Sequence, residues 1–273
     1  MYSYLDKVHK SNENLLLEVD RICKKYDIHY YLHGGTYLGA TRHKSFVPWD
    51  DDVDITMKRR DYENFISVFN KEKKDNFILL KDDEYDEFFD FIPKIADISV
   101  KYKKTAMGED SFYNYRYNHP TLDIFILDTV YKRHKLQLIL LKFIYALSMG
   151  HRPYVDYSKF KGISKVCAII LTNIGKIIPF KYTAKLYHKV QIMDNKYDDK
   201  SRFLFLSNEQ PHPHYWGLVY SKKHYKTGHT SVINGNTYPS PYAPDKWLSY
   251  VYGNWKTLPN EEDRKPQHII ELE

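Results

Sequence analysis

An acidic run is the part of this sequence whose residue types and spacing most directly suggest chemistry. Asp50, Asp51, Asp52 and Asp54 occupy four of five consecutive positions. Carboxylates this close repel one another, and an apolar surround raises their pKa values further. We therefore expect a positive group among them.

The alternation at the end of this run predicts how two of the acids are presented. In a β-strand successive side chains point to opposite faces, so Asp52 and Asp54 would share one face while Val53 and Ile55 face a core. Two carboxylates placed in this way can hold a hard cation through oxygen ligands, which suits Mg²⁺ or Mn²⁺. The alternative is an aspartate run that caps a turn or a helix and is merely solvated.

A glycine pair precedes the acids at a place where an anion could bind. Residues 30–32 are predicted to form a short strand that ends in Gly34, Gly35 and Thr36. Glycines let backbone N–H groups approach a phosphate, and the Thr36 hydroxyl would add a donor; a plain Gly-Gly turn is the alternative. Cationic side chains that could neutralise a phosphate follow: Arg42, His43 and Lys44.

A further carboxylate lies inside a later strand. Residues 121–128 follow Pro120 and are rich in β-forming residues, with Asp123 embedded among them. An acid in an apolar strand is costly unless it is paired or bound to a metal. A metal ligand and a buried salt bridge are therefore the two interpretations of Asp123. Asp128 has the opposite parity and should face away from Asp123 or end the strand.

Hydrophobic periodicity predicts the elements that must position these residues. A long amphipathic helix is expected over residues 5–26, and a second helix is expected to begin with Asp61 as its N-cap. Strands are expected over residues 77–80 and directly after Lys94. In the second half of the chain, helices are expected over residues 136–147, 163–178 and 181–194.

Two of these later helices are strongly apolar. Neither the helix over 136–147 nor the one over 163–178 reaches the roughly 20 uninterrupted residues of a membrane-spanning helix. We therefore expect ordinary core helices. The alternative is that Lys142, Lys165 and Lys176 suit them to a membrane interface.

Size and composition are those of a soluble globular protein with one large domain. The chain has 273 residues, of which 42% are hydrophobic and 28% charged, and a net charge of +6. This excludes a disordered chain and argues against nucleic-acid binding. Cys23 and Cys167 fall at apolar helical positions and are expected to be buried. The polar N-terminus lacks the apolar region of a secretory signal, so a cytoplasmic location is expected.

Two long segments resemble one known family. Residues 34–65, GGTYLGATRHKSFVPWDDDVDITMKRRDYENF, resemble the signature of the LicD family of cholinephosphotransferases and fukutin-like proteins, within the nucleotidyltransferase superfamily. Residues 237–264, TYPSPYAPDKWLSYVYGNWKTLPNEEDR, resemble the closing pattern of the same family. The middle of the chain, roughly 131–231, is poorly covered by the resemblance.

The resemblance implies a fold as well as a site. The expected fold class is α/β (α+β), with a nucleotidyltransferase-like mixed sheet covered by helices. Residues 1–135 would form the catalytic core, and residues 136–273 a mostly helical, aromatic-rich region packed on it in one structural unit. The implied catalytic and metal-binding residues are Asp52, Asp54 and Asp123. The implied substrate-binding residues are Gly34, Gly35, Thr36, Arg42, His43, Trp49 and Lys94.

The resemblance also implies a reaction. The expected activity is transfer of phosphocholine from CDP-choline to a hydroxyl of a surface glycan, lipopolysaccharide, capsule or teichoic acid precursor, with Mg²⁺ or Mn²⁺. A lipid-linked acceptor would bring the protein to the inner face of the plasma membrane. The alternatives are another activated alcohol such as CDP-ribitol or CDP-glycerol, nucleotide transfer to a small molecule, and a non-catalytic glycan-binding protein. The aromatic candidates for a choline cage are Trp49, Tyr215, Trp216, Trp247 and Tyr250.

Overall fold

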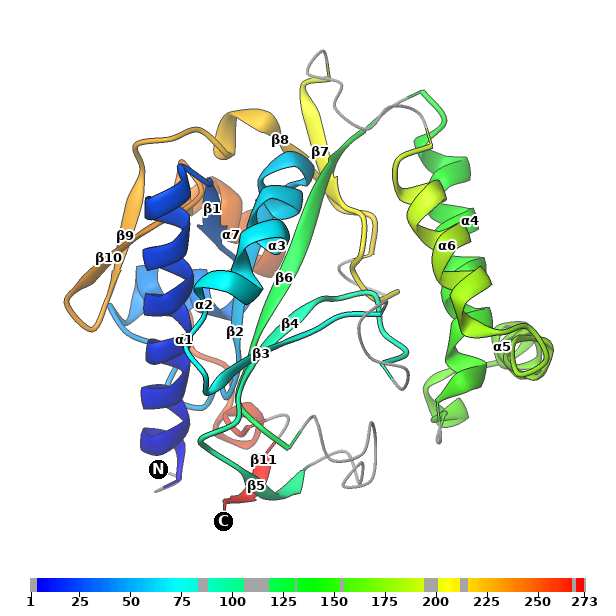
Figure 1. Ribbon diagram of the computed structural model, residues 1–273, viewed down its shortest axis with the longest axis horizontal. Coiled ribbons are helices and arrows are strands. Elements are labelled where there is room, and N and C mark those ends of the chain that lie inside the picture. Colours follow the sequence, from blue (N-terminus) through cyan, green and yellow to red (C-terminus); the bar gives the residue numbers. More distant parts are fainter. Residues whose placement is uncertain are drawn as a thin grey trace.

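A mixed seven-stranded sheet forms the centre of the computed structural model, and helices pack against it (Figure 1). The strand order is β1-β2-β6-β4-β3, and β7 and then β8 continue from the other half of β6. The structure describes residues 4–82, 88–105, 118–130, 132–152, 155–193, 201–211, 216–266 and 269–272. The expected α+β fold class is confirmed.

The elements have the following bounds. The strands are β1 (Tyr30–Leu32), β2 (Val53–Lys58), β3 (Phe77–Leu80), β4 (Lys94–Asp97), β5 (Tyr102–Thr105), β6 (Thr121–Thr129), β7 (Phe203–Leu206), β8 (Val219–Ser221), β9 (Thr230–Ile233), β10 (Asn236–Pro239) and β11 (Ile269–Leu272). The α-helices are α1 (Leu5–Tyr26), α2 (Gly34–Arg42), α3 (Arg59–Glu72), α4 (His134–Ser148), α5 (Ile163–Gly175), α6 (Phe180–Gln191) and α7 (Pro244–Tyr252).

Strand β6 organises the sheet because three other strands pair with it. β2 lies parallel to β6, whereas β4 pairs antiparallel with the first part of β6 and β7 with its last part. The apolar residues Leu122 and Ile124 of β6 are fully buried, as are Val53 and Ile55 of β2. Helices α1 and α3 pack against these strands. The acids of β2 and β6 are therefore held by two strands whose apolar side chains are fully buried.

Most of the expected helices and strands are confirmed. The prediction of Asp61 as the N-cap of α3 is wrong. The helix expected over residues 5–26 has these bounds, and the strands expected at 30–32 and 77–80 are β1 and β3. Asp61 lies in the first turn of α3 rather than at its N-cap, because β2 leads directly into the helix through the extended residue Lys58. The Asp61 carboxylate instead accepts a hydrogen bond of 3.1 Å from the backbone N–H of His29.

Helices α4, α5 and α6 form a separate layer beside the sheet (Figure 1). The core interpretation holds for the inner face of α4 but is wrong for α5. Only Ala168, Thr172 and Gly175 of α5 are buried, and Cys167 is exposed instead of buried. Among the described helices, none is both long and apolar enough to cross a bilayer alone; α5 and α6 meet that condition only as a pair bent by 120°.

A buried ion pair joins α3 to the central strand. The Arg59 guanidinium donates to both carboxylate oxygens of Asp128, with an Nε to Oδ1 distance of 3.0 Å, and also to the hydroxyl of Ser207. Asp128 is 6% exposed and Arg59 is 8% exposed. Asp128 thus pairs with Arg59 of α3, whereas Asp123 pairs with Lys94 of β4. The two acids face different partners, as the opposite parity of their positions in β6 predicts. Burial would lower the pKa of Arg59, but the carboxylate of Asp128 outweighs burial and raises it.

We expect Asp128→Asn to lower the free energy of unfolding by about 3–5 kcal/mol, because it leaves a buried guanidinium without its counter-ion. Replacing both partners with apolar residues, as in Arg59→Met with Asp128→Leu, should recover most of the loss. Urea unfolding followed by circular dichroism measures both effects. Asp245→Asn, in the exposed pair with Lys256, is the control and should change stability by less than about 1 kcal/mol. Equal losses in the buried and the exposed variants would contradict the prediction.

Candidate active site

The predicted acids of β2 and β6 lie opposite each other. Asp54 and Asp123 are register partners on the two parallel strands, both near the strand beginnings. The backbone carbonyl of Asp54 accepts from the His33 N–H at 3.0 Å, and the backbone N–H of Asp54 donates to Thr36 Oγ1 at 2.8 Å. Asp54 is therefore fixed to the first turn of α2 as well as to the sheet.

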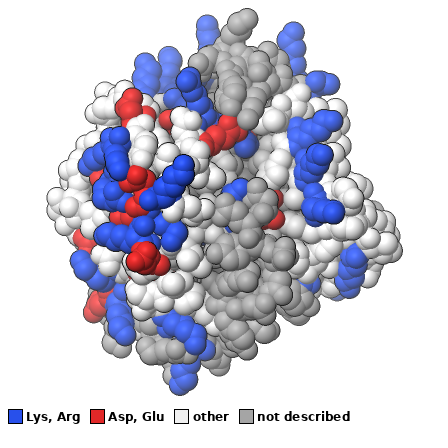
Figure 2. All heavy atoms as spheres, in the orientation of Figure 1, with Lys and Arg blue, Asp and Glu red and all other residues white. Residues whose placement is uncertain are grey.

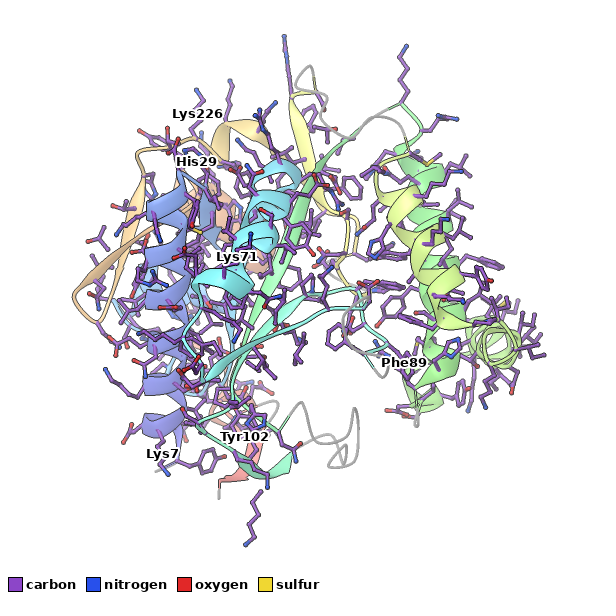
Figure 3. All side chains as sticks on the ribbon, viewed as in Figure 1. Lys7, His29, Lys71, Phe89, Tyr102 and Lys226 are labelled. Carbon is purple, nitrogen blue, oxygen red and sulfur yellow. The ribbon has the colours of Figure 1, made fainter. Side chains whose placement is uncertain are left out.

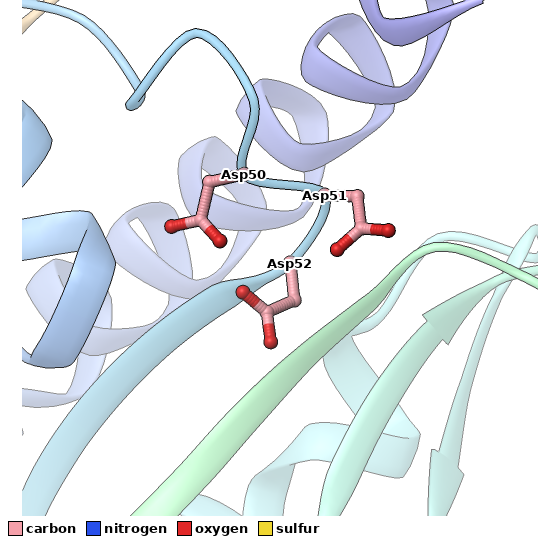
Figure 4. A group of neighbouring side chains, drawn as sticks. All are labelled: Asp50, Asp51 and Asp52. Carbon is pink, nitrogen blue, oxygen red and sulfur yellow. The ribbon is translucent and has the colours of Figure 1, made fainter. Parts of the chain in front are cut away.

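Three more carboxylates gather just before β2. Figure 4 shows Asp50, Asp51 and Asp52 along the turn that leads into the strand. Each offers one oxygen, and these oxygens lie within 4.8 Å of one another. Asp51 is 1% exposed, whereas Asp50 and Asp52 are partly exposed. A single cation could contact all three carboxylates at this spacing.

The glycine pair makes room for two of these carboxylates. A Cβ on Gly34 would stand 2.4 Å from Asp54 Oδ2, and a Cβ on Gly35 would stand 2.2 Å from Asp50 Oδ2. Gly34 and Gly35 open helix α2 and do not form the plain turn that was the alternative, so the positive end of the helix dipole faces these acids. The anions nearest this helix N-terminus are therefore the protein's own carboxylates, and phosphate binding there stays a prediction.

Lys94 supplies the positive group that the acidic run requires. It begins β4 opposite Asp123, and its Nζ forms an ion pair with Asp123 Oδ2. Burial alone would lower the pKa of Lys94, but Asp123, Asp90 and Asp52 together raise it. Lys94 is therefore a fixed cation inside the acidic group. Of the two interpretations of Asp123, the salt bridge is present, and the metal-ligand role stays a prediction.

The acids perturb one another strongly at Asp54. Burial raises its pKa well above the ordinary value, the negative charges of Asp52, Asp123 and Asp50 raise it further, and only Lys94 lowers it. Crowded carboxylates with a raised pKa bind a divalent cation in competition with protons. The described donors nearest Asp54 are oxygens, which fit Mg²⁺ or Mn²⁺ better than a soft metal.

Other predicted substrate-binding residues are spread along α2. Thr36 is 2% exposed and its hydroxyl is used to hold β2. Arg42 lies at the other end of the helix, about 12 Å from Gly34 by helix geometry, where it donates to the carbonyl of Trp255 at 2.8 Å and to His43 at 2.9 Å. Arg42 and His43 therefore do not contact the same part of the site as the glycines.

Trp49 lies between the Arg42–His43 pair and the acids. Its ring centroid lies 6.3 Å from that of His43, and the Arg264 guanidinium lies 5.8 Å above the ring. Because Trp49 directly precedes Asp50, the cations of this group lie beside the acidic turn. Burial lowers the pKa of Arg42, and Arg264 lowers it further. The contact of Arg264 with Trp49 was not predicted, because Arg264 follows an acidic stretch near the C-terminus and is distant from Trp49 in the sequence.

The remaining aromatic candidates differ in accessibility. Trp247 is 1% exposed and its indole donates to Tyr225 Oη at 3.1 Å, so it is a core residue rather than a headgroup ligand. Tyr250 is 52% exposed, and Trp216 packs against the α4 and α6 core. Tyr215 lies outside the described residues.

Glu209 is a carboxyl that sequence reasoning missed, because it falls in no motif and no periodic segment. It follows Asn208, whose side-chain amide donates to the carbonyls of Ile124 and Phe91 and accepts from the N–H of Ile126. Glu209 therefore lies beside the strand that carries Asp123. Burial raises its pKa to about 8.

A broad surface cavity of about 1140 Å³ lies elsewhere, at the opposite end of β2. It is lined by Lys58, Arg202, Lys222, Lys223 and Lys226, together with Asp61 and aromatic residues. The acidic group is the better candidate for chemistry, because its carboxylates converge and perturb one another, whereas the cavity is an open basic surface.

The segment that carries these site residues matches a known protein family. Residues 27–139 match the LicD/FKTN/FKRP nucleotidyltransferase domain. This range includes all of the predicted catalytic, metal-binding and substrate-binding residues, from Gly34 to Asp123.

Full-length similarity extends beyond that domain. The lipopolysaccharide cholinephosphotransferase LicD of Haemophilus influenzae is 27% identical over 270 residues, which covers 94% of this chain and 93% of that protein. Two uncharacterized proteins, RT0683 of Rickettsia typhi and RP689 of Rickettsia prowazekii, are 25% and 26% identical. The matches cover 70% and 45% of this chain, and 61% and 59% of those two proteins.

We expect Gly34→Ala to weaken Mn²⁺ binding by about tenfold or more, because the new methyl group must displace the Asp54 carboxylate. Electron paramagnetic resonance of free Mn²⁺ measures the affinity. Gly162→Ala is a matched control, since Gly162 has φ +54° against +51° for Gly34 but nothing within 4 Å of an added Cβ. Both substitutions place a Cβ on a residue with positive φ, a conformation that L side chains rarely adopt. Equal Mn²⁺ affinity in the two variants would contradict the assignment, as would a wild-type protein that binds no Mn²⁺.

We expect Glu209→Gln to stabilise the protein at pH 7.5 and to have little effect at pH 5. The folded state keeps the Glu209 proton up to about pH 8, whereas the unfolded state releases it near the ordinary value of 4.5. Wild-type stability should therefore fall across this window, by up to about 1.4 kcal/mol per pH unit, and the glutamine variant should lack that contribution. Thermal unfolding at several pH values measures the difference. Glu261→Gln, at an exposed position, should show no such difference; a pH-independent effect of Glu209→Gln would refute the assignment.

Proposed function

Because this chain belongs to the LicD family, a family of transferases, we propose that it transfers phosphocholine from CDP-choline to a hydroxyl of a cell-surface glycan. The observation that carries the proposal is the group of five carboxylates at the beginnings of β2 and β6, one of which, Asp123, is paired with Lys94. The similarity to the Haemophilus influenzae cholinephosphotransferase over most of both chains supports the headgroup, and its name supports a lipopolysaccharide acceptor.

The acceptor oxygen would form a new bond to the phosphorus that carries choline. The bond between that phosphorus and the bridging oxygen would break, and CMP would leave with the bridging oxygen and its electrons. The hydroxyl proton would pass to a carboxylate of the acidic group. We assign the acceptor side to Asp123, because Lys94 holds this side chain in one place at the start of β6.

The carboxylates of Asp50, Asp51, Asp52 and Asp54 would hold Mg²⁺ or Mn²⁺. When bound, such a cation neutralises the charge of the donor diphosphate and aligns it for in-line attack. The three oxygens within 4.8 Å of one another support this use. The chain's own contribution is to keep these acids fixed, through the α2 N-terminus and the hydrogen bond from Asp54 to Thr36.

The rest of the donor would lie toward the cationic group at the end of α2. His43 and the Arg264 guanidinium lie beside Trp49, which directly precedes the acids, and Arg42 donates a hydrogen bond to His43. Guanidinium groups bind phosphate oxygens, and an indole face binds a quaternary ammonium ion. We therefore propose that Trp49 and its cationic neighbours contact CDP-choline, with the acidic turn between them and the acceptor.

We expect the protein to release CMP from CDP-choline in the presence of Mn²⁺ and a crude glycan acceptor, and Asp54→Asn to lower the rate by about 100-fold or more. Asp52→Asn should have a similar effect. Product analysis should find phosphocholine on the acceptor. Asp75→Asn, an exposed acid outside the site, should keep full activity.

The outcomes separate the parts of the proposal. Release of CMP only from CDP-ribitol or CDP-glycerol would overturn the headgroup and keep the reaction type. Nucleotide found on the product, with no free CMP, would indicate nucleotidyl transfer instead. Full activity in the folded Asp52 and Asp54 variants would refute the role of the acidic group.

A further inference from the structure

Helix α5 presents an unusual apolar stripe to solvent. Ile163, Val166, Ile170 and Ile174 follow one another at helical spacing and are 84%, 56%, 52% and 45% exposed. Residues spaced by three, four and four lie along one side of an α-helix. The small residues that α5 buries against α4 lie on its other side, so the stripe faces away from the protein.

The neighbouring helices also expose large apolar side chains. Leu136, Ile139 and Phe143 share one side of α4 and are 47%, 65% and 48% exposed. Tyr182 and Leu186, one turn apart on α6, are 58% and 48% exposed. Large exposed apolar residues on three packed helices are more than the scattered single residues of an ordinary surface.

The segment that contains these helices has a high net positive charge. Residues 134–191 contain ten lysine and arginine residues and one acid, Asp156, for a net charge of +9. The whole chain has +6, so the remaining residues have −3. Exposed lysines lie on each helix or at its end, including Lys142, Lys165 and Lys185, and Figure 2 shows basic side chains along this part of the surface.

We propose that the outer surface of α4, α5 and α6 docks on an anionic lipid bilayer. Helices with an apolar face and lysines beside it lie in the plane of the interface, with the apolar side chains among the acyl chains and the lysines at the headgroups. A second copy of this chain would present the same +9 surface and would be repelled. Anionic headgroups complement both the charge and the apolar stripe.

The docked helices are tied to the acidic site. The Tyr187 ring of α6 stacks on Phe91 with a centroid distance of 3.7 Å. Phe89, which Figure 3 labels beside these helices, packs against Phe180 of α6 with a centroid distance of 5.1 Å. Phe91 lies three residues before Lys94. Docking would therefore place the acidic site beside the membrane surface at a fixed position. The docking inference goes beyond the proposed transfer reaction and does not rest on it, because vesicle binding is measured without donor or acceptor.

Flotation of the full chain with vesicles tests the proposal. We expect binding to vesicles that contain phosphatidylglycerol and little binding to pure phosphatidylcholine. Replacing the stripe, as in Ile163→Ser with Ile170→Ser and Ile174→Ser, should weaken binding by about tenfold or more. The matched control removes three exposed apolar side chains elsewhere, Leu17→Ser with Ile98→Ser and Phe203→Ser, and should bind as the wild type does.

A second pair of variants tests the charge. Lys142→Glu with Lys185→Glu should weaken binding to the anionic vesicles by about tenfold or more. Lys7→Glu with Lys71→Glu makes the same change in net charge away from these helices (Figure 3) and should have little effect. Absence of binding to the anionic vesicles, or equal binding by all variants, would overturn the proposal. Concentration-dependent dimerisation without lipid, abolished by the three serine substitutions, would also overturn it and assign the surface to self-association.

Discussion

Repulsion among carboxylates is the constraint on which the arrangement around β2 depends. Five acids converge at the beginnings of β2 and β6, and in water-poor surroundings they could not all stay ionised without compensation. The structure compensates in two ways. Gly34 and Gly35 let Asp54 and Asp50 approach the N-terminus of α2, and Lys94 pairs with Asp123. The compensation is incomplete, since burial and the other acids still raise the pKa of Asp54, so a cation is the natural complement.

Strand β6 connects the acidic group to the other elements of the fold. Its first part carries Asp123 and pairs with the strand that begins at Lys94, and its last part carries Asp128, which holds α3 through Arg59. Asn208 then bonds the middle of β6 to the carbonyl of Phe91. One strand therefore positions the acidic group, the main covering helix and the loop against which α6 packs. A shift of β6 by one residue would exchange the two faces and break all three connections.

Periodic patterns in the sequence predicted the structural features that depend on residues close together in the chain. The alternation around Asp54, the burial of Val53 and Ile55, and the helix over residues 5–26 all follow from periodicity. The features that were predicted wrongly or missed depend on contacts between residues that are distant in the sequence. Periodicity identifies an apolar stripe on α5 but does not say whether another element covers it. The ion pair of Lys94 and the raised pKa of Glu209 arise from strands and loops that are distant in the sequence.

The charge distribution shows why whole-chain averages misdirect a functional interpretation. A net charge of +6 over 273 residues suggests a weak general preference for anions, yet it combines +9 on residues 134–191, the segment that contains α4, α5 and α6, with −3 on the remaining residues. The acidic group therefore lies in the negative part of the chain, and the basic helices lie outside the residues that match the nucleotidyltransferase domain, apart from the start of α4. In the two proposals made above, these parts would bind ligands of opposite charge, a divalent cation at one and an anionic surface at the other. Because Phe91 connects α6 to the segment that leads into Lys94, the membrane surface would also fix the direction from which a lipid-linked acceptor reaches Asp123.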